Sequence, residues 1–305
     1  MDTPLVSIAI PAYKDKYLHE AISSVLNQTY TNVEVIIVND CSPNDIDSIV
    51  KSFSDPRIRY YVNEANLGKN NPANNWNKCL SYARGEYFSL LCDDDLYDCN
   101  FIKTLVLLAQ RYPETNVFRC RGCVIDKEKN VIDNYPSSPE WETTVDYMWH
   151  VFKNYRYQTI SEFMYRTNVV RMVGGYATLP LAWYADYLSV YKFSMTGGIA
   201  SSSKTMMYFR QSGINISSQD DRNTELKLLA SNLYIKETVM VINQLVIDDD
   251  YKNRLVNILN YRTKQITKYS LDHAPRKVLF KLIRENKTYG VPLKMFWKAI
   301  FKRRK

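Results

Sequence analysis

Short apolar segments that alternate with amphipathic helical segments constrain the fold of this chain more than any other feature of its sequence. Within the first 125 residues, runs rich in β-branched residues end at polar turn residues, and the stretches between them repeat apolar side chains at helical spacing. The expected strands are 6–10, 33–38 and 86–91, and the expected helices are 17–27, 46–53 and 74–83. Apolar strands separated by helices indicate an α/β fold, in which a Rossmann-like, mostly parallel sheet is covered by helices on both faces.

Polar residues at the ends of these strands form the candidate site, because ligands bind beyond the carboxyl ends of strands in such sheets. Asp40 follows the second expected strand and Asp93-Asp94-Asp95 follow the third. Three consecutive carboxylates repel one another unless a cation or hydrogen-bond donors compensate them. Asp oxygens suit Mg²⁺ or Mn²⁺, which keep positions open for substrate phosphates. The sequence therefore predicts a divalent metal site; the alternative is an acidic N-cap for a helix over 96–111.

Several classes of enzyme lose their support because their motifs are missing from the sequence. The nine glycines spell neither G-x-G-x-x-G nor G-x-x-x-x-G-K-[ST], so the dinucleotide fingerprint and the P-loop are excluded. Neither H-E-x-x-H nor G-x-S-x-G occurs, which disfavours zinc proteases and serine hydrolases. The single C-x-x-C, Cys120-Arg-Gly-Cys123, has no second pair at zinc spacing and is expected to contribute core thiols. The chain starts in a strand-like segment without a signal peptide, so we expect reduced thiols in a cytosol.

The net charge of +8 belongs almost entirely to the last 34 residues. Residues 272–305 contain eleven Lys or Arg and two acids, a net charge of +9, so the other 271 residues sum to −1. The main body is therefore not expected to bind nucleic acid. Residues 293–302 place Leu293, Phe296, Trp297, Ile300 and Phe301 on one helical face and lysines on another. This pattern predicts a helix that binds an anionic membrane surface; the alternative is an ordinary packed helix with a solvated face.

A series of motifs in a fixed order runs from about residue 4 to residue 217. The motifs occupy residues 6–13, 17–30, 33–42, 66–68, 75–77, 83–87, 91–95, 174–176, 183–186 and 210–217. Each is short, but the series as a whole resembles the inverting nucleotide-sugar glycosyltransferases of family 2, which have the GT-A fold. The resemblance implies that a nucleotide diphosphate sugar, with uridine as the expected base, binds at the carboxyl edge of the sheet.

The resemblance also implies roles for individual donor-site residues. Pro11, Ala12 and Tyr13 would line the base, and Asp40 would hydrogen-bond to it. The matching motifs add Asn66 and Asn77 to the same site. In many relatives an Arg precedes the position of Asn77; here that residue is Trp76, which either packs in its helix or contacts the base.

The acidic cluster would hold both the ribose and a divalent metal, Mn²⁺ or Mg²⁺, that bridges the two phosphates. In this family the motif is often Asp-x-Asp-Asp, whereas here Cys92 occupies the first position. In this register Asp93 contacts the ribose, Asp94 binds the metal directly and Asp95 supports it as the second metal-site carboxylate. The ion would stabilise the leaving diphosphate as a Lewis acid.

An inverting transfer requires one base that removes the proton of the acceptor hydroxyl as its oxygen attacks the anomeric carbon. By resemblance this catalytic residue is Asp186, although Ala185 replaces the acid that usually precedes it. The alternative is that Asp186 caps a helix over 187–195. Trp183 would offer a flat face to the acceptor sugar, or else pack in the core.

Together these features predict a GT-A domain over residues 1–217 and a helical C-terminal region over 218–305. The expected enzyme transfers a sugar to a lipid-linked or oligosaccharide acceptor in cell-surface polysaccharide synthesis, at the cytoplasmic face of the membrane. One rival is a sugar-nucleotide pyrophosphorylase, but the Gly-rich, basic N-terminal loop that grips a triphosphate is missing. The other is a non-catalytic membrane or nucleic-acid adaptor, which leaves Asp93-Asp94-Asp95 and Asp186 unexplained.

Overall fold

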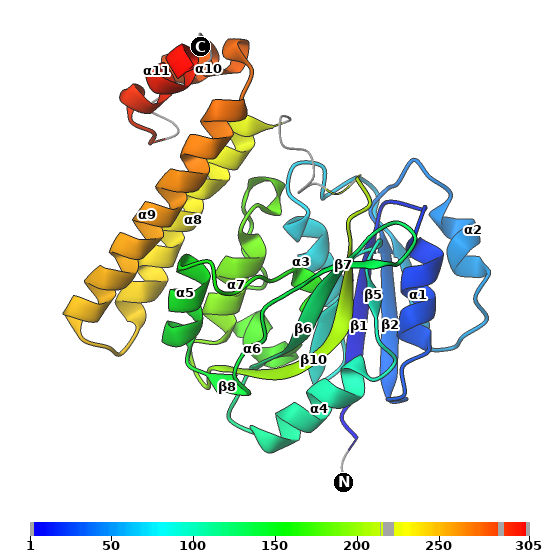
Figure 1. Ribbon diagram of the computed structural model, residues 1–305. Coiled ribbons are helices and arrows are strands. Elements are labelled where there is room, and N and C mark those ends of the chain that lie inside the picture. Colours follow the sequence, from blue (N-terminus) through cyan, green and yellow to red (C-terminus); the bar gives the residue numbers. More distant parts are fainter. Residues whose placement is uncertain (1–2, 214, 216–222, 286–289, 303–305) are drawn as a thin grey trace.

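One sheet of ten strands forms the centre of the part of the chain that is described here, residues 3–213, 215, 223–285 and 290–302 of a computed structural model (Figure 1). The strand order is β3-β2-β1-β4-β9-β6-β10-β5, with β7 beside β6 and β8 beside β10. The strands are β1 (Val6–Ala12), β2 (Val33–Asn39), β3 (Ile58–Val62), β4 (Tyr87–Leu90), β5 (Leu96–Tyr97), β6 (Val117–Ile125), β7 (Val131–Asn134), β8 (Trp141–Glu142), β9 (Phe163–Arg166) and β10 (Ile199–Arg210).

The helices follow the strands in the order expected for an α/β fold. They are α1 (Leu18–Leu26), α2 (Ile46–Lys51), α3 (Ala73–Tyr82), α4 (Phe101–Arg111), α5 (Thr144–Phe152), α6 (Thr167–Met172), α7 (Ala185–Phe193), α8 (Thr224–Gln244), α9 (Asp249–His273), α10 (Arg276–Arg284) and α11 (Leu293–Lys302), with 3₁₀ turns η1 (Ile160–Glu162) and η2 (Pro180–Ala182).

The three predicted strands, β1, β2 and β4, are parallel as expected, and β3 extends this parallel part of the sheet. β1 lies between β2 and β4 and runs parallel to both, and β2 runs parallel to β3, so their carboxyl ends meet at one edge. β9 is antiparallel to β4 and to β6, whereas β10 is parallel to β6. The predicted α/β class is therefore confirmed, and the parallel arrangement applies to one half of a mixed sheet.

Alternate residues of the buried strands enter two separate cores, one on each face of the sheet. In β1, Val6, Ile8 and Ile10 pack with α1, α2 and α4, whereas Ala9 faces α3, α5 and α7. Burial on both faces explains why these strands are apolar throughout. The side chains of β1 therefore contribute to the packing of helices on both faces of the sheet.

Two local predictions are wrong. The helix expected over 96–111 begins at Phe101, because Leu96 and Tyr97 pair with β10 instead. Asn100 is its N-cap residue, so Asp93-Asp94-Asp95 do not cap this helix. Strand β3 was not predicted; it is a half-buried strand at the edge of the sheet, where the pattern of side chains is weak.

The predicted C-terminal helical region is confirmed in the described residues, whereas the expected boundary at 217–218 lies outside them. α8 and α9 lie side by side as a long hairpin, with α10 and α11 at one end (Figure 1). Tyr234 on α8 and Leu255 on α9 join the core that contains α5 and α7. In the part of the chain that the structure describes, none of the helices is both long and apolar enough to span a membrane.

The structure corrects the view of α11 as a free apolar stripe. Phe296 and Ile300 are buried with Leu271 and Leu282 of the neighbouring helices. The other three apolar residues of the stripe remain exposed: Leu293, Trp297 and Phe301. Two of the five apolar residues of the predicted membrane-binding face are therefore used for packing. Lys287, Arg303, Arg304 and Lys305 of the predicted basic tail lie outside the described residues.

Candidate active site

The carboxyl ends of β1, β2 and β4 bring the predicted donor-site residues together. Pro11 and Ala12 are the last residues of β1 rather than residues after it, and Tyr13 follows with 40% of its surface exposed. The Asp40 N–H donates to the Ala12 carbonyl (2.9 Å), and the Tyr13 N–H donates to Asp93 Oδ2 (2.9 Å). The three strand ends are thus connected by hydrogen bonds.

Asp40 organises the loop that contains Asn66. Its Oδ1 accepts hydrogen bonds from Asn63 Nδ2 and from the Leu67 N–H, and its Oδ2 accepts one from the Gly68 N–H (2.7 Å). A Cβ at Gly68 would lie 2.8 Å from Asp40 Oδ2, so only glycine allows this approach without displacing the carboxylate. Asn66 is half-buried in the same loop.

Lys14 compensates the charge of two of the three consecutive Asp residues, and no sequence pattern predicted this role. Its Nζ lies 3.1 Å from Asp93 Oδ1 and also contacts Asp94 Oδ2. Its backbone N–H donates to Asp93 Oδ2 (2.7 Å). Burial disfavours the ammonium, but Asp93 and Asp94 outweigh that effect and raise the pKa of Lys14. A single lysine after a strand is common, so only the fold identifies its role.

Asp94 and Asp95 have different surroundings. Asp94 Oδ2 accepts a hydrogen bond from Asn215 Nδ2 (3.2 Å). Asp95 is almost completely buried, and its two oxygens accept hydrogen bonds from Ser161 Oγ (2.7 Å) and the Arg210 N–H (3.1 Å). Burial and the neighbouring Asp94 carboxylate raise the pKa of Asp95 to about 8.

The donor atoms at this edge fit a magnesium-type or manganese-type ion. Among the described residues, no group of three or more His, Cys, Asp or Glu side chains could enclose a metal. Such ions are often held by one or two carboxylates together with substrate phosphates, so Asp94 is sufficient on the protein side. Ser212 Oγ (3.5 Å) and Asn215 Nδ2 (3.2 Å) both contact the same Asp94 oxygen, Oδ2.

Asn77 and Trp76 secure the loop that precedes α7 through contacts with Tyr176. Asn77 Nδ2 donates to the Tyr176 carbonyl (3.0 Å), and its Oδ1 accepts from the Tyr176 N–H (2.7 Å). Trp76 is buried and packs edge-on against the Tyr176 ring, at 5.8 Å between ring centres. Trp76 therefore packs in its helix, which was one of the two alternatives for it.

Asp186 lies in the first turn of α7, on the same face of the sheet as α3 and α5. The N-cap residue of α7 is Tyr184, so the alternative in which Asp186 caps this helix is wrong. Gln158 Nε2 donates to Asp186 Oδ2 (3.3 Å). Burial raises the pKa of Asp186 to about 6 although this hydrogen bond acts in the opposite direction. A carboxylate with such a pKa can accept a proton near neutral pH.

A buried network connects Asp186 to the acidic cluster through η1 and the residues before it. Tyr147 donates its hydroxyl proton to Gln158 Oε1, and Arg119 contacts both Tyr147 and Glu162. Although burial disfavours its charge, the Glu162 carboxylate raises the pKa of Arg119, and the two form a buried ion pair. Ser161, beside Glu162 in η1, holds Asp95.

The loop before α7 is strained. Leu181, Ala182 and Tyr184 all have positive φ, at 59°, 51° and 66°, although none is glycine. Strained backbone of this kind is concentrated at functional sites. Trp183, in the middle of this loop, is half-buried, and Lys227 Nζ lies 4.6 Å from the centre of its ring.

A sheet edge that gathers carboxylates, with a further carboxylate in the first turn of α7, agrees with a glycosyltransferase. The sequence profile described as Glycosyl transferase family 2 matches residues 7–187, more than half of the chain, and the chain belongs to this family. It is therefore a transferase, and the predicted GT-A fold is confirmed by solved structures.

Two of those structures cover nearly the whole chain. The crystal structure of S. aureus TarS 1–349 in complex with UDP-GlcNAc has a TM-score of 0.72 at 16% identity and covers 98% of this chain and 91% of its own. The mannosyltransferase PcManGT from Pyrobaculum calidifontis, in complex with GDP-Man and Mn²⁺, has a TM-score of 0.58 at 14% identity and covers 97% and 85%.

A curated relative adds information about substrates. The GalNAc(5)-diNAcBac-PP-undecaprenol beta-1,3-glucosyltransferase of Campylobacter jejuni is 33% identical over 131 residues, which are 42% of this chain and 41% of that protein. The chain spans between about two fifths and a half of the length of this and two other curated bacterial relatives.

Proposed function

We propose that this chain transfers one sugar, with inversion, from a nucleotide diphosphate donor, expected to be uridine-based, to a hydroxyl of a lipid-linked glycan in cell-surface polysaccharide synthesis. The observation that supports this proposal most is the buried network through η1. Side-chain contacts run from Asp186 to Glu162, and Ser161, the residue before Glu162, binds Asp95 of the acidic cluster. The UDP-GlcNAc complex of TarS and the undecaprenol acceptor of the Campylobacter relative agree with these substrate classes.

The donor would lie along the carboxyl ends of β1, β2 and β4. Pro11, Ala12 and Tyr13 line the base, Asp40 hydrogen-bonds to it, and Asp93 contacts the ribose. Asn66 contributes from the Asp40 loop. Asn77 acts on the donor site indirectly, because both ends of its amide are already bonded to Tyr176.

The proton transfer is assigned to Asp186. Its carboxylate accepts the proton of the acceptor hydroxyl, and the acceptor oxygen forms its bond to the anomeric carbon. The bond from that carbon to the phosphate oxygen breaks on the opposite side, and the nucleoside diphosphate leaves with the electron pair. Asp186 then releases its proton to solvent, and Trp183 presents its ring to the acceptor sugar.

Asp94 would hold the divalent metal directly, with Asp95 as the supporting carboxylate. When bound, Mn²⁺ or Mg²⁺ would offset the negative charge that develops on the leaving diphosphate. Lys14 contacts Asp94 in this structure, so the ammonium would have to move when an ion of the same sign binds.

The proposal is tested by two isosteric substitutions and one control. Asp186→Asn should preserve donor affinity and lower the rate of transfer by about 10²-fold or more, the usual range for a general base. Asp94→Asn should abolish transfer and most metal-dependent donor binding while the protein remains folded. Asp249→Asn, whose side chain is 95% exposed, should behave like the wild type. Full activity of Asp94→Asn, or of the wild type in excess chelator, would exclude the metal assignment.

We also propose that the protein attaches to the inner face of the cell membrane through residues 272–305, assisted by α9. A groove of about 710 Å³ between α9 and α11 supports this part of the proposal. Its walls carry Lys264 and Lys268 from α9, Lys294 and Lys298 from α11, and the exposed Trp297. Clustered lysines beside exposed aromatic rings favour an anionic lipid surface.

A further inference from the structure

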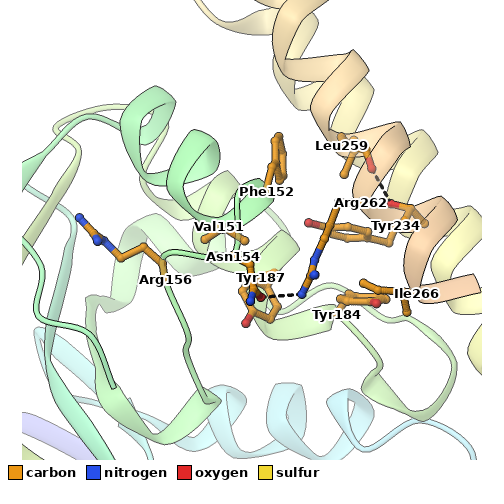
Figure 2. A pocket seen from close by; sticks show the side chains of 11 residues that line it. Val151, Phe152, Asn154, Arg156, Tyr184, Tyr187, Tyr234, Leu259, Arg262 and Ile266 are labelled. Atoms are coloured by element: carbon orange, nitrogen blue, oxygen red, sulfur yellow. Dashed lines mark hydrogen bonds between the residues drawn. The ribbon is translucent and has the colours of Figure 1, made fainter. Parts of the chain in front are cut away.

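A small cavity lies where the C-terminal hairpin packs against the domain that carries Asp186. Its volume is about 60 Å³, enough for a few water molecules or one small polyatomic group. It is formed by the end of α5, the first turn of α7, and the facing sides of α8 and α9. Figure 2 shows the Arg262 side chain reaching from α9 toward Asn154, with the rings of Tyr184, Tyr187 and Tyr234 around it.

Arg262 brings a positive charge into this cavity without an acidic partner. Among the described residues, its guanidinium has one hydrogen-bond partner, Asn154 Oδ1 at 2.5 Å, and no carboxylate oxygen within 4.0 Å. Arg156, which also lines the cavity, differs because its guanidinium pairs with Glu142 at 3.3 Å. A guanidinium has five N–H donors, so Arg262 retains several for a ligand.

The partner of Arg262 is held in place by the fold. Asn154 has φ of 64°, and its Nδ2 donates to the Tyr157 hydroxyl (2.8 Å), which leaves its Oδ1 directed to Arg262. Asn154 therefore orients the guanidinium through a neutral acceptor without cancelling its charge. A half-buried cation kept in this way is suited to bind an anion.

The cavity and the proposed base share one structural element, the start of α7. Tyr184 and Tyr187, which line it, flank Asp186 at the start of α7. The donor diphosphate is assigned to a different place, the carboxyl edge of β1, β2 and β4, where Lys14 and Asp94 lie. An anion bound by Arg262 would therefore belong to the acceptor side.

We propose that Arg262, with Tyr184 and Tyr187, binds a phosphate group of the acceptor, such as the phosphate that joins the glycan to its lipid. This inference rests on the proposed function, because the acceptor is a phosphate-bearing glycan only if that function is correct. A phosphate matches the planar fork of a guanidinium, and the tyrosine rings shield the contact from water. Because Tyr184 and Tyr187 flank Asp186, a phosphate bound here would orient the acceptor hydroxyl toward Asp186.

A direct binding experiment tests the site without a known acceptor. The full chain is titrated with inorganic pyrophosphate at constant ionic strength, and the apparent affinity is taken from the rise in the thermal midpoint. Arg262→Gln should weaken the affinity at the cavity by about tenfold or more, the range for a charge-assisted contact. Arg254→Gln, on the same helix with its side chain 70% exposed, is the matched control and should not change it.

Arg262→Lys separates the roles of charge and shape, because it keeps the charge and loses the bidentate fork. It should bind pyrophosphate with intermediate affinity, and it provides a folded variant if Arg262→Gln does not fold. Equal affinities of the wild type, Arg262→Gln and Arg254→Gln would overturn the proposal, since any other phosphate site in the chain would then account for all of the binding.

A kinetic experiment separates this inference from the proposed function. Transfer is measured to a synthetic glycosyl diphosphate with a short alkyl chain and to the matching alkyl glycoside without phosphates. Arg262→Gln should raise KM for the diphosphate acceptor by about tenfold and leave kcat and the alkyl glycoside unaffected. An equal loss with both acceptors would contradict the phosphate contact. No transfer by the wild type would contradict the proposed function, while the pyrophosphate titration would still report on the site.

Discussion

Gln158 shows how an uncharged side chain can determine the properties of a nearby carboxylate. Its amide oxygen accepts a hydrogen bond from Tyr147 and its amide nitrogen donates to Asp186, so the amide has a single orientation. The donated hydrogen bond favours the ionised carboxylate and opposes the effect of burial. We therefore expect Gln158 to be a positioning residue that keeps the proposed base deprotonated and correctly aimed.

Gln158→Met removes this hydrogen bond with little change in volume. The pKa of Asp186 should then rise above its value of about 6, because one of the donors that oppose burial is lost while the backbone N–H groups of Tyr187 and Asp186 remain. A base is active when deprotonated, so the acid limb of the pH–rate profile of kcat/KM should move upward by about one pH unit. Donor affinity should be unchanged. An unshifted acid limb in a folded Gln158→Met protein, with Gln244→Met as the exposed control, would contradict this role.

The groups that surround Asp186 must be considered when this profile is interpreted. Its titratable neighbours come from several elements and are Tyr135, Tyr147, Glu162, Tyr165, Tyr184, Tyr187 and Tyr234. Burial raises the pKa of each tyrosine, so all of them are neutral below pH 8. Burial raises the pKa of Glu162 to about 8. An acid limb near pH 6 would therefore report Asp186 rather than a tyrosine or Glu162.

Among the elements, those with strong periodic patterns were predictable from the sequence. The first two strands and their helices appeared within one or two residues of their bounds, because buried apolar strands and amphipathic helices have distinct patterns. β10 was not predicted, because its middle residues Ser202, Ser203 and Lys204 are polar and it pairs with partners distant in sequence. Its last residue, Arg210, supports Asp95 only through that pairing.

The candidate site shows the same division between local and long-range information. Asp93, Asp94 and Asp186 were found because acidic residues after apolar strands and the family motifs are local signals. Gln158 and Ser161 were not found, because single polar residues in an irregular segment have no pattern of their own. Their importance depends on contacts with residues 28 and 66 positions away, which only the folded chain provides.

The loop that joins α6 to α7 is the element that places Trp183 and Asp186. Gly174 and Gly175 begin it, both with positive φ, at 87° and 85°. A Cβ at Gly175 would lie 2.4 Å from Asn77 Oδ1, whereas a Cβ at Gly174 would have no atom within 4 Å. Alanine at position 174 would therefore introduce backbone strain alone, whereas alanine at position 175 would introduce the same strain and a steric clash with Asn77.

Gly174→Ala should cost about 1 kcal/mol in the free energy of unfolding, because alanine is strained at positive φ. Gly175→Ala should cost about 2–4 kcal/mol, since it also displaces Asn77 from the Tyr176 backbone. The displaced loop should lower kcat in Gly175→Ala more than it weakens donor binding. Urea unfolding and transfer kinetics of both variants measure this; equal stabilities of the two would show that the Asn77 contact adapts at no cost.

At the scale of the whole molecule, the C-terminal hairpin connects the proposed membrane surface to the acceptor side. α8 begins beside α10, and near this end Lys227 of α8 lies over Trp183. Figure 1 shows α10 and α11 together at the same end of the hairpin. A lipid-linked glycan held at this end would therefore have its sugar close to the loop that precedes Asp186.

Deleting α11 is a poor test of membrane attachment, because Phe296 and Ile300 cover Leu271 and Leu282 and their loss would expose a core. A better variant replaces four exposed lysines of the α9–α11 groove by Gln: Lys264, Lys268, Lys294 and Lys298. The matched control replaces four exposed lysines elsewhere: Lys103, Lys153, Lys204 and Lys236. Both variants lose the same net charge, so only the position of the charge differs.

The groove variant should bind vesicles that contain phosphatidylserine at least tenfold more weakly than the control, since each Lys near an anionic surface contributes about 1 kcal/mol. High salt should weaken the wild type without abolishing its binding, because Trp297, Phe301 and Leu293 are exposed apolar groups that do not respond to screening. Sedimentation with the vesicles at low and high salt measures both effects, and transfer to a short soluble acceptor should remain intact in both variants. Equal binding by the groove variant and the control would mean that attachment depends on net charge alone, and the groove would then have no specific part in it.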